Sequence, residues 1–568
     1  MQKTNVQSGA KLPSLPVGNS DWAAVKAGYW SADKTQLISG LLDKKSTVAV
    51  FTRPRRFGKT FAMRMLKTFF EKTETSNAHL FKGTKVWQDP EHRSEQGKYP
   101  VIFITFKDVK SETWKGTVGL IADVIAEEFL RHRMAFGDET CPEKWRCDFN
   151  DLQKKSATTS TLMRSLGLLA AALHAHYKAK PVILIDEYDS PINYAATHGF
   201  GEEALQFFRN FLSGAMKDGE HCRLGVITGI LRIAKEGVLS GLNNPEVWSV
   251  FDNDYSDCFG FTEDEVMDLL SACGHPEKIA EAKDWYDGYR FGPSEIYNPW
   301  SVLNYARRGF EPKAYWLDTS SNDIVLDLLP RLSPEMHDTV SNLFEKKEGE
   351  VTLSPDLGPY GLIQDNEEIL WSLLVHTGYL KVTSGPDSNG TATIAFPNRE
   401  LRRVFRDDIL ARMKRQPSGQ FVGRLTRALS SGDAERFRKS LEDFLSVSAS
   451  YFDTAKEDFF HGLLLGLLAA LIESYEITSN REEGDGRPDI LMKPRPGVTL
   501  PGVVLELKSP KIPARASQKR IDALLVAAAK QARKQIDEKR YAAEMEAAGV
   551  TVLKYGIGFS GKRVELAK

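Results

Sequence analysis

Two kinds of apolar pattern alternate along the first part of the chain. Between continuous apolar runs, apolar residues recur every three or four positions, as in FAMRMLKTFFE at 61–71, and predict helices. The continuous runs themselves predict buried strands, and they lie at 47–52, 100–106, 181–186 and 223–228. Because strands that alternate with helices are typical of a parallel sheet, we predict an α/β domain over residues 15–245.

The pattern changes beyond residue 245. Residues 246–330 are helical and aromatic in pattern and predict a small lid. In 331–450, a helical stretch precedes two short strand patterns separated by GPDSNG, which is similar to a winged helix. Residues 451–568 again predict an α/β domain, with the alternating strand VVLELK at 503–508. Since no low-complexity linker separates these parts, we expect the domains to communicate.

Composition and apolar run length predict a cytoplasmic protein without a membrane-spanning helix. At about 150 residues a domain, the 568 residues predict about three to four domains. The 75 Lys and Arg balance the 76 Asp and Glu, so any nucleic-acid surface must be local. The most apolar run, 461–472, is shorter than the ~20 residues that a spanning helix needs. The five scattered cysteines show no paired spacing and predict reduced thiols in a cytoplasmic protein.

The segment FTRPRRFGKT at 51–60 follows a strand pattern and precedes a helix pattern. It fits the phosphate-binding motif G-x-x-x-x-G-K-[ST] except that Arg53 takes the place of the first glycine. We expect Gly58 to let the backbone approach phosphate, Lys59 to reach the outer phosphates and Thr60 to bind magnesium. The loop residues Arg56 and Phe57 complete the predicted ATP contacts. Taken alone, the segment also fits a solvated basic turn.

A second motif favours the nucleotide site. KPVILIDEYDS at 180–190 is an apolar strand that ends in Asp186 and Glu187. A buried parallel strand would deliver both carboxylates to a ligand, whereas the alternative is a cap on the following turn. We expect Asp186 to hold magnesium through water and Glu187 to polarise the attacking water. Thr228 ends a further strand and is predicted to contact the nucleotide, and Arg232 and Lys235 are weaker candidates for sensing the terminal phosphate.

Near the other end, Asp489 follows a proline and precedes Glu506-Leu507-Lys508 in the pattern PD-x16-E-x-K. Alternation in VVLELK places Glu506 and Lys508 on one face of the strand. If a hairpin brings Asp489 beside Glu506, the two carboxylates and the Leu507 carbonyl predict a site for magnesium or manganese. Lys508 would then orient or activate a water for cleavage of a phosphodiester.

Residues around this motif could extend the site. The stretch 521–545 predicts one long helix, and either Glu457 or Glu473 could add a carboxylate. A basic run precedes the helix and suits phosphate contacts, although a solvated face explains it equally well. This run contains Lys508, Lys511, Arg515, Lys519 and Arg520.

With both motifs established, the chain resembles, nearly from end to end, a bacterial family that joins an AAA-ATPase-like domain to a C-terminal PD-(D/E)XK nuclease domain. The resemblance implies that the loop with Arg53 is a genuine nucleotide site. It also implies that Asp489, Glu506 and Lys508 form the nuclease triad and that Gln535 is the helix glutamine that follows it. The stretches that carry the resemblance include FTRPRRFGKT, ILIDEYDSP, ITGILRIAKEG, FGFTEDEV, WYDGYRFG, IYNPWSVLNY, YFDTAKEDFFHGLLLGL, GDGRPDI, VVLELK and KQIDEKRY.

These observations predict a multidomain α/β protein with a P-loop NTPase core, a helical lid, a winged-helix-like middle region and a restriction-endonuclease-like C-terminal domain. The favoured function is DNA cleavage that uses Mg²⁺ or Mn²⁺ and is controlled by ATP. One alternative is an ATP-dependent regulatory protein whose nuclease fold only grips nucleic acid or a partner. Another is a nuclease whose ATPase is inactive. The sequence does not determine the oligomeric state, and a homo-oligomer is compatible with it.

Overall fold

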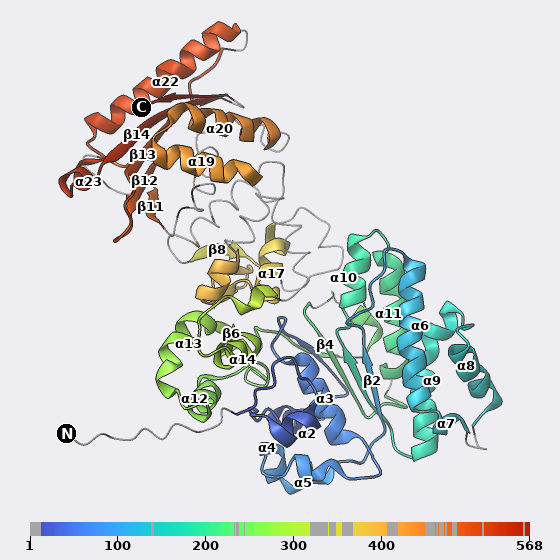
Figure 1. The fold of residues 1–568 in the computed structure, drawn as a ribbon. Coiled ribbons are helices and arrows are strands. Elements are labelled where there is room, and N and C mark those ends of the chain that lie inside the picture. The colour runs from blue at the N-terminus through green and yellow to red at the C-terminus, as the bar shows by residue number, and fades with distance from the viewer. Residues whose placement is uncertain are drawn as a thin grey trace, which may run out of the picture. The chain divides into compact units, whose positions relative to one another are not determined.

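The chain folds into two compact units, comprising residues 1–328 with 350–402 and residues 329–349 with 403–568. Each unit is described by itself in a computed structural model (Figure 1). The expected domain boundaries at residues 245, 330 and 450 stay predictions. The structure describes residues 13–568 apart from 138–140, 218, 232, 234–237, 244, 319–338, 340–342, 344–347, 355–366, 406–418, 449–460, 462–463, 465–467, 469–470, 472–473, 480–485, 514–515 and 561–562.

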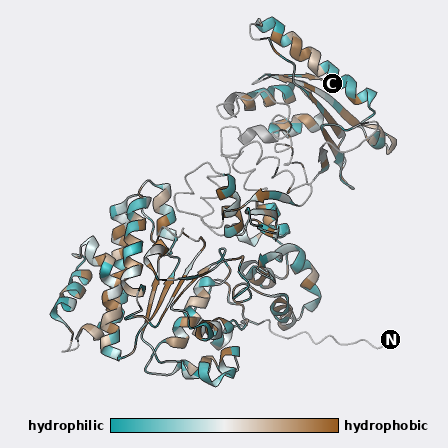
Figure 2. Cartoon of the chain, turned by 180° about the vertical axis from the view of Figure 1, so that it is seen from behind, coloured by the Kyte–Doolittle hydropathy of each residue, from teal (hydrophilic) through white to brown (hydrophobic). Residues whose placement is uncertain are grey.

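A five-stranded parallel sheet forms the centre of the first unit, with the order β2-β3-β4-β1-β5. Its apolar strands are visible in Figure 2 as a hydrophobic layer. The four predicted strands are confirmed, whereas the short, partly exposed β5 was not predicted. The strands are β1 Val48–Thr52, β2 Val101–Thr105, β3 Val182–Asp186, β4 Leu224–Gly229 and β5 Glu246–Trp248.

Helices cover this sheet where the pattern predicted them. Apolar residues of the stretch between β2 and β3, such as Ile121, Phe129 and Leu166, are buried in one core with strand residues. The helices of this part are α1 Trp22–Gly28, α2 Gln36–Lys44, α3 Lys59–Phe70, α4 Lys85–Gln88, α5 Pro90–Ser94, α6 Trp114–Arg131, α7 Met134–Gly137, α8 Glu143–Gln153, α9 Thr159–Tyr177, α10 Ser190–Thr197 and α11 Gly201–Met216.

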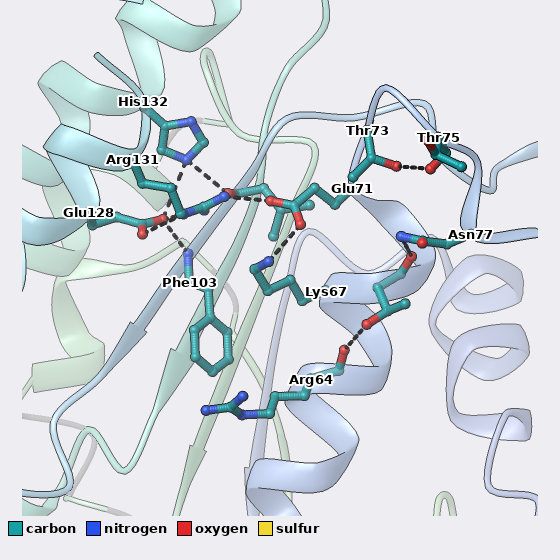
Figure 3. A network of polar contacts seen from close by, with 12 residues as sticks. Arg64, Lys67, Glu71, Thr73, Thr75, Asn77, Phe103, Glu128, Arg131 and His132 are labelled. Atoms are coloured by element: carbon teal, nitrogen blue, oxygen red, sulfur yellow. Dashed lines mark hydrogen bonds and ion pairs between the residues drawn. The ribbon is translucent and has the colours of Figure 1, made fainter. Parts of the chain in front are cut away.

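An ion network fixes the C-terminal end of α3 to α6 and to β2 (Figure 3). Lys67 donates to Glu71 at 2.6 Å, and Glu71 pairs with Arg131 of α6. Arg131 Nε donates to Glu128 at 2.8 Å, and the carboxylate of Glu128 also accepts from the backbone N–H of Phe103 at 2.7 Å. The helix that begins at the phosphate loop is therefore anchored at its far end by charge.

After the sheet, the chain forms the expected aromatic helical region, and its core contains Tyr286, Tyr297, Tyr305 and Tyr315. The predicted helix and hairpin around GPDSNG are confirmed as α17, β9 and β10, with β8 as a further strand beside β10. The hairpin β6–β7 was not predicted. These elements are α12 Glu263–Ala272, α13 Ile279–Tyr286, β6 Tyr289–Phe291, β7 Ser294–Ile296, α14 Pro299–Arg307, β8 Gly349–Thr352, α17 Glu367–Thr377, β9 Lys381–Ser384 and β10 Thr391–Ala395.

The second unit has a mixed sheet of order β11-β12-β13-β14-β15, in which only β13 and β14 are paired in parallel among the described strands. Val503, Leu505 and Leu507 of β13 face one core, as predicted. The elements are α19 Gly419–Ser431, α20 Ala434–Ser448, β11 Tyr475–Ser479, β12 Ile490–Pro494, β13 Gly502–Lys508, α22 Gln518–Glu538, α23 Ala543–Ala547, β14 Val552–Ser560 and β15 Arg563–Ala567.

The single long helix predicted for 521–545 is wrong. Helix α22 ends at Glu538, because Arg540 takes a left-handed φ of 52° and breaks the repeat. The turn brings the Tyr541 ring into a core with Ile536 and Val504. Burial of this ring offsets the free-energy cost of ending the helix. Helix propensities alone do not predict this turn.

The sequence also led to expectations about membrane-spanning helices and about the cysteines. No helix in the described part of the chain is long and apolar enough to cross a membrane. Of the apolar run 461–472, Leu464 and Leu468 are helical and buried in the core beside β13, and most of the remainder lies outside the described residues. All five cysteines are unpaired, as predicted.

Candidate active sites

The phosphate loop lies between β1 and α3. Gly58 precedes α3 with a left-handed φ of 83°, which glycine adopts without strain, and a Cβ placed there would meet no atom within 4 Å. Lys59 Nζ donates to the carbonyls of Arg53 and Pro54 at 2.8 and 2.9 Å. Burial lowers the pKa of Lys59. The loop therefore holds its lysine inside, with open space at the helix N-terminus where an anion is favoured.

Arg56 and Phe57 occupy the same loop with different surroundings. Arg56 has a left-handed φ of 69°, and its guanidinium lies 4.3 Å from the centre of the Trp300 ring. The Phe57 ring is buried against Tyr289 and Phe291. The side chain of Phe57 thus packs in the core, so a contact of this residue with phosphate would come from its backbone.

The fully buried Asp186 joins three elements of the first unit. At the end of β3, its carboxylate accepts from the Thr60 hydroxyl of α3 at 2.8 Å and from the Thr228 hydroxyl of β4 at 2.7 Å. The carboxyl ends of parallel strands meet at one sheet edge, and this explains why residues so far apart in sequence converge. Carboxylate and hydroxyl oxygens are the donors that a hard cation such as Mg²⁺ prefers, so the residues fit magnesium.

Glu187 follows in a strained conformation. Its φ of 54° is left-handed, which costs a non-glycine residue about 1–3 kcal/mol. Burial raises the pKa of Glu187, while the charge of Lys59 opposes that shift. A strained, half-buried carboxylate beside the lysine suits a residue that orients or deprotonates water.

The sequence did not reveal the roles of Tyr188 and Asp189. Asp189 accepts from the backbone N–H groups of Ile230 and Leu231 at 2.9 and 3.0 Å, and the Tyr188 hydroxyl donates to the Leu231 carbonyl at 3.0 Å. Together they fix the segment that follows β4. The candidate sensors Arg232 and Lys235 on that segment lie outside the described residues. The sequence DEYD, with a second aspartate three residues after Asp186, was the pattern that could have indicated the role of Asp189.

In the second unit, the predicted hairpin brings Asp489 beside Glu506. Leu507 N–H donates to Asp489 Oδ2 at 2.7 Å, and the backbone N–H of Asp489 points to Glu506 Oε2 at 3.4 Å. Burial raises the pKa of Asp489, and the hydrogen bond from Leu507 opposes this. Leu507 therefore contributes its N–H, and the predicted role of its carbonyl as a metal ligand stays a prediction.

Two more predicted residues meet at Glu506, which is 2% exposed. Gln535 of α22 donates to Glu506 and also points to the Tyr541 hydroxyl at 3.4 Å. Lys508 Nζ lies 3.9 Å from Glu506 Oε1. Three predicted residues of the nuclease motif, Asp489, Lys508 and Gln535, thus lie beside the fourth, Glu506.

Glycines on the neighbouring strand explain how α22 comes so close. Gly556 and Gly558 pair in register with Glu506 and Lys508. A Cβ at Gly556 would lie 2.2 Å from the Ala529 carbonyl oxygen, and one at Gly558 would lie 2.2 Å from that of Leu525. Only glycine permits this approach of helix to sheet.

The donor set of this site is small in the described part of the chain. No group of three or more His, Cys, Asp or Glu residues suited to a metal occurs there. Glu457 and Glu473, the suggested additional carboxylates, lie outside it, as does Arg515. His461, which the sequence did not indicate, lies 2.8 Å from the Asp489 carbonyl through its Nε2. Asp489 and Glu506 by themselves provide the hard oxygen donors that fit Mg²⁺ or Mn²⁺.

Family comparisons match the two regions of the chain that contain these sites. Residues 16–239 match the family described as predicted AAA-ATPase, and residues 455–568 match the PD-(D/E)XK nuclease superfamily. The chain joins an AAA-ATPase-like domain to a PD-(D/E)XK domain. This confirms the resemblance and the multidomain α/β fold predicted from the sequence.

Individual relatives are distant. An uncharacterized protein in the vnfD 5' region of Azotobacter chroococcum mcd 1 is 28% identical over 319 residues, and the match spans 56% of each protein, about half the relative's length. A Walker-type ATPase of Pyrococcus abyssi is 15% identical with a TM-score of 0.35, covering 66% of this chain and 95% of that one. The ORC2 protein of Aeropyrum pernix is 12% identical with a TM-score of 0.23, covering 72% and 97%.

Proposed function

We propose that the protein binds and hydrolyses ATP with Mg²⁺ in the AAA-ATPase-like domain and cleaves DNA with Mg²⁺ or Mn²⁺ in the PD-(D/E)XK domain. The observation that carries the nuclease activity is the convergence of Asp489, Glu506, Lys508 and Gln535 from a hairpin and a separate helix. A purely structural sheet has no need to place the partly buried Asp489 beside the buried Glu506, because burial of carboxylates without a cation is costly.

In the nuclease domain, Asp489 and Glu506 would hold the cation. The cation would supply Lewis-acid stabilisation of the phosphodiester. Gln535 fixes Glu506, and Lys508 is placed to orient the attacking water. Lys511, Lys519 and Arg520 are exposed and suit the phosphate backbone of DNA.

In the ATPase domain, Thr60 and Asp186 would hold Mg²⁺, which neutralises phosphate charge. Lys59 would reach the outer phosphates, and the backbone of Arg56, Phe57 and Gly58 would surround them. Glu187 would polarise water, and Thr228 would keep Asp186 oriented. Nucleotide control of cutting is part of the proposal, and a reduced cytoplasmic setting suits the five free cysteines.

A cleavage assay that crosses substrate form with nucleotide state tests this function. Purified protein is incubated with single-stranded, linear and supercoiled DNA and with RNA, with magnesium or manganese, and with ATP, ADP or neither. We expect metal-dependent cleavage of DNA that Lys508→Ala removes. Absence of cleavage on every substrate, unchanged by Lys508→Ala, would instead favour a regulatory protein whose nuclease fold only binds nucleic acid or a partner.

A further inference from the structure

Arg53, the residue in place of the first loop glycine, reaches out of the loop into the region that follows the sheet. Its Nη1 donates to the carbonyls of Thr52 and Trp248 at 2.9 and 2.8 Å, and its Nη2 donates to that of Tyr255 at 3.3 Å. The side chain is fully buried. One guanidinium therefore joins the start of the phosphate loop to β5 and to the turn at Tyr255.

The Arg53 guanidinium is charged although its burial is unfavourable. Burial lowers the pKa of Arg53 to about 10, which leaves it protonated at neutral pH. It lies 5.3 Å from the ring centres of both Phe259 and Phe291. Among the residues that the structure describes, no carboxylate forms an ion pair with it. Electrostatic interactions with Cys258 and Asp252 only partly offset the effect of burial. A buried charge that contacts carbonyls and aromatic faces instead of a paired carboxylate is expensive, and a packing role would be met by an apolar side chain.

The backbone of the same residue contacts the phosphate-binding lysine. The Arg53 carbonyl accepts from Lys59 Nζ at 2.8 Å. Lys59 has to turn away from this carbonyl and from that of Pro54 in order to reach a phosphate. Arg53 thus contacts Lys59, which would change partner on ATP binding, through its carbonyl, and it contacts the segment 248–259 through its guanidinium.

We propose that Arg53 is a positioning residue that transmits occupation of the phosphate loop to the segment 248–259. The proposal rests on ATP binding at this loop, as proposed above. The planar guanidinium reaches carbonyls of both Trp248 and Tyr255, a geometry that a lysine ammonium cannot reproduce. Since Arg53 does not take a left-handed φ, its backbone has no need of glycine.

Hydrogen exchange on the full chain, with and without MgATP, tests the coupling, and calorimetry measures ATP affinity. In the wild type, MgATP should slow exchange in peptides covering 246–262 by about tenfold. Arg53→Met and Arg53→Gly should both abolish this slowing and weaken ATP binding about tenfold, although the glycine restores the usual loop residue. Arg53→Lys should be intermediate. Arg64→Met, on the exposed side of α3, is the matched control and should behave as the wild type.

Each other outcome is decisive. If the wild type binds MgATP but exchange at 246–262 does not change, the coupling is wrong, whatever the variants' folding. If the Arg53 variants melt earlier yet keep wild-type affinity and wild-type slowing, Arg53 is only a structural strut and the proposal fails. If neither the wild type nor Lys59→Ala binds MgATP, the proposed ATPase function fails and this inference falls with it.

Discussion

The two sites hold their central carboxylates with different partners. Asp186 is bound by the hydroxyls of Thr60 and Thr228, which come from separate elements. Asp489 is bound by the backbone N–H of Leu507 on the adjacent strand. A hydroxyl can both donate to a carboxylate and ligate a cation, so Thr60 would be able to exchange partners on binding of the proposed magnesium. The backbone contact at Asp489 instead fixes the carboxylate for a cation without such an exchange.

The helices beside the two sites are also fixed differently. Helix α3 is anchored by the ion network of Glu71, Arg131 and Glu128. Helix α22 approaches β14 across Gly556 and Gly558, where the absence of side chains sets the distance. The stability of the ion network at α3 should therefore depend on pH. The packing of α22 should instead be disturbed by any side chain added at Gly556 or Gly558.

The largest effect should come from Asp489→Ala. Removal of the carboxylate that is proposed to hold the metal should slow DNA cleavage about a thousandfold, which corresponds to about 4 kcal/mol of lost transition-state stabilisation. ATP binding should be unchanged, because Asp489 belongs to the other domain. Gel-based cleavage rates and calorimetry with MgATP measure the two activities. Asp522→Ala, at the exposed surface of α22, is the control, and cleavage by Asp489→Ala within tenfold of it would contradict the assignment.

Lys59→Ala should produce the opposite failure. Loss of the charge-assisted hydrogen bonds that Lys59 is proposed to donate to phosphate should weaken MgATP binding about a hundredfold, or about 3 kcal/mol. The metal ligands of the nuclease domain remain, so manganese binding should persist while cleavage or DNA affinity changes. Lys82→Ala, an exposed lysine beyond α3, serves as the control. A folded Lys59→Ala protein that has lost ATP binding, cuts every substrate at the wild-type rate and binds DNA with unchanged affinity would show that the domains act independently.

The sequence predicted much of both sites because their chemistry is local. β1, the loop and α3 follow one another in the chain, and β3 ends at Asp186. The carboxyl ends of parallel strands meet at one sheet edge, so these local patterns place the residues at the same edge. Asp489 and Glu506 belong to one hairpin, whose spacing fixes their neighbourhood.

Contacts between distant segments could not be predicted in the same way. The hydrogen bond from Arg53 to Trp248 spans 195 residues and depends on the three-residue strand β5, which is too short to give a pattern. The roles of Gly556 and Gly558 depend on the register with β13 and on the packing of α22, neither of which the sequence encodes in a local pattern. The turn after α22 at Arg540 brings the Tyr541 ring into a core with Ile536 and Val504, and this packing has no local sequence pattern.

Gly556→Ala tests whether glycine packing holds the nuclease site. The added methyl group would collide with the backbone of α22 at Ala529 and Arg533, which should cost about 3 kcal/mol of stability. The shift of Gln535 away from Glu506 should also weaken Mn²⁺ binding about tenfold. Thermal unfolding and calorimetry with Mn²⁺ measure both effects. Gly119→Ala, where a Cβ meets open space on α6, should be neutral or stabilising, and equal behaviour of the two variants would refute the role of Gly556.

The smallest effect is expected for Glu128→Gln in the network that anchors α3. Burial alone would raise the pKa of Glu128, but hydrogen bonds from Arg131 and His132 lower it. A carboxylate with a lowered pKa stabilises the fold above its unfolded-state pKa of about 4.3, and this stabilisation is lost as pH falls through the lower folded-state pKa. The variant should therefore lose about 1–2 kcal/mol at pH 7, since Arg131 keeps its pairing with Glu71.

The measurement is the melting temperature of the transition that MgATP raises, because a ligand stabilises the domain that binds it. The difference between wild type and Glu128→Gln should be full at pH 7 and should shrink below about pH 4, where the wild-type carboxyl also becomes neutral. Glu91→Gln, at an exposed position of helix α5, provides the control for a surface carboxylate. A difference that stays constant from pH 7 to the acid limit would show that Glu128 contributes shape rather than charge, and α3 would then be held by packing in the same way as α22.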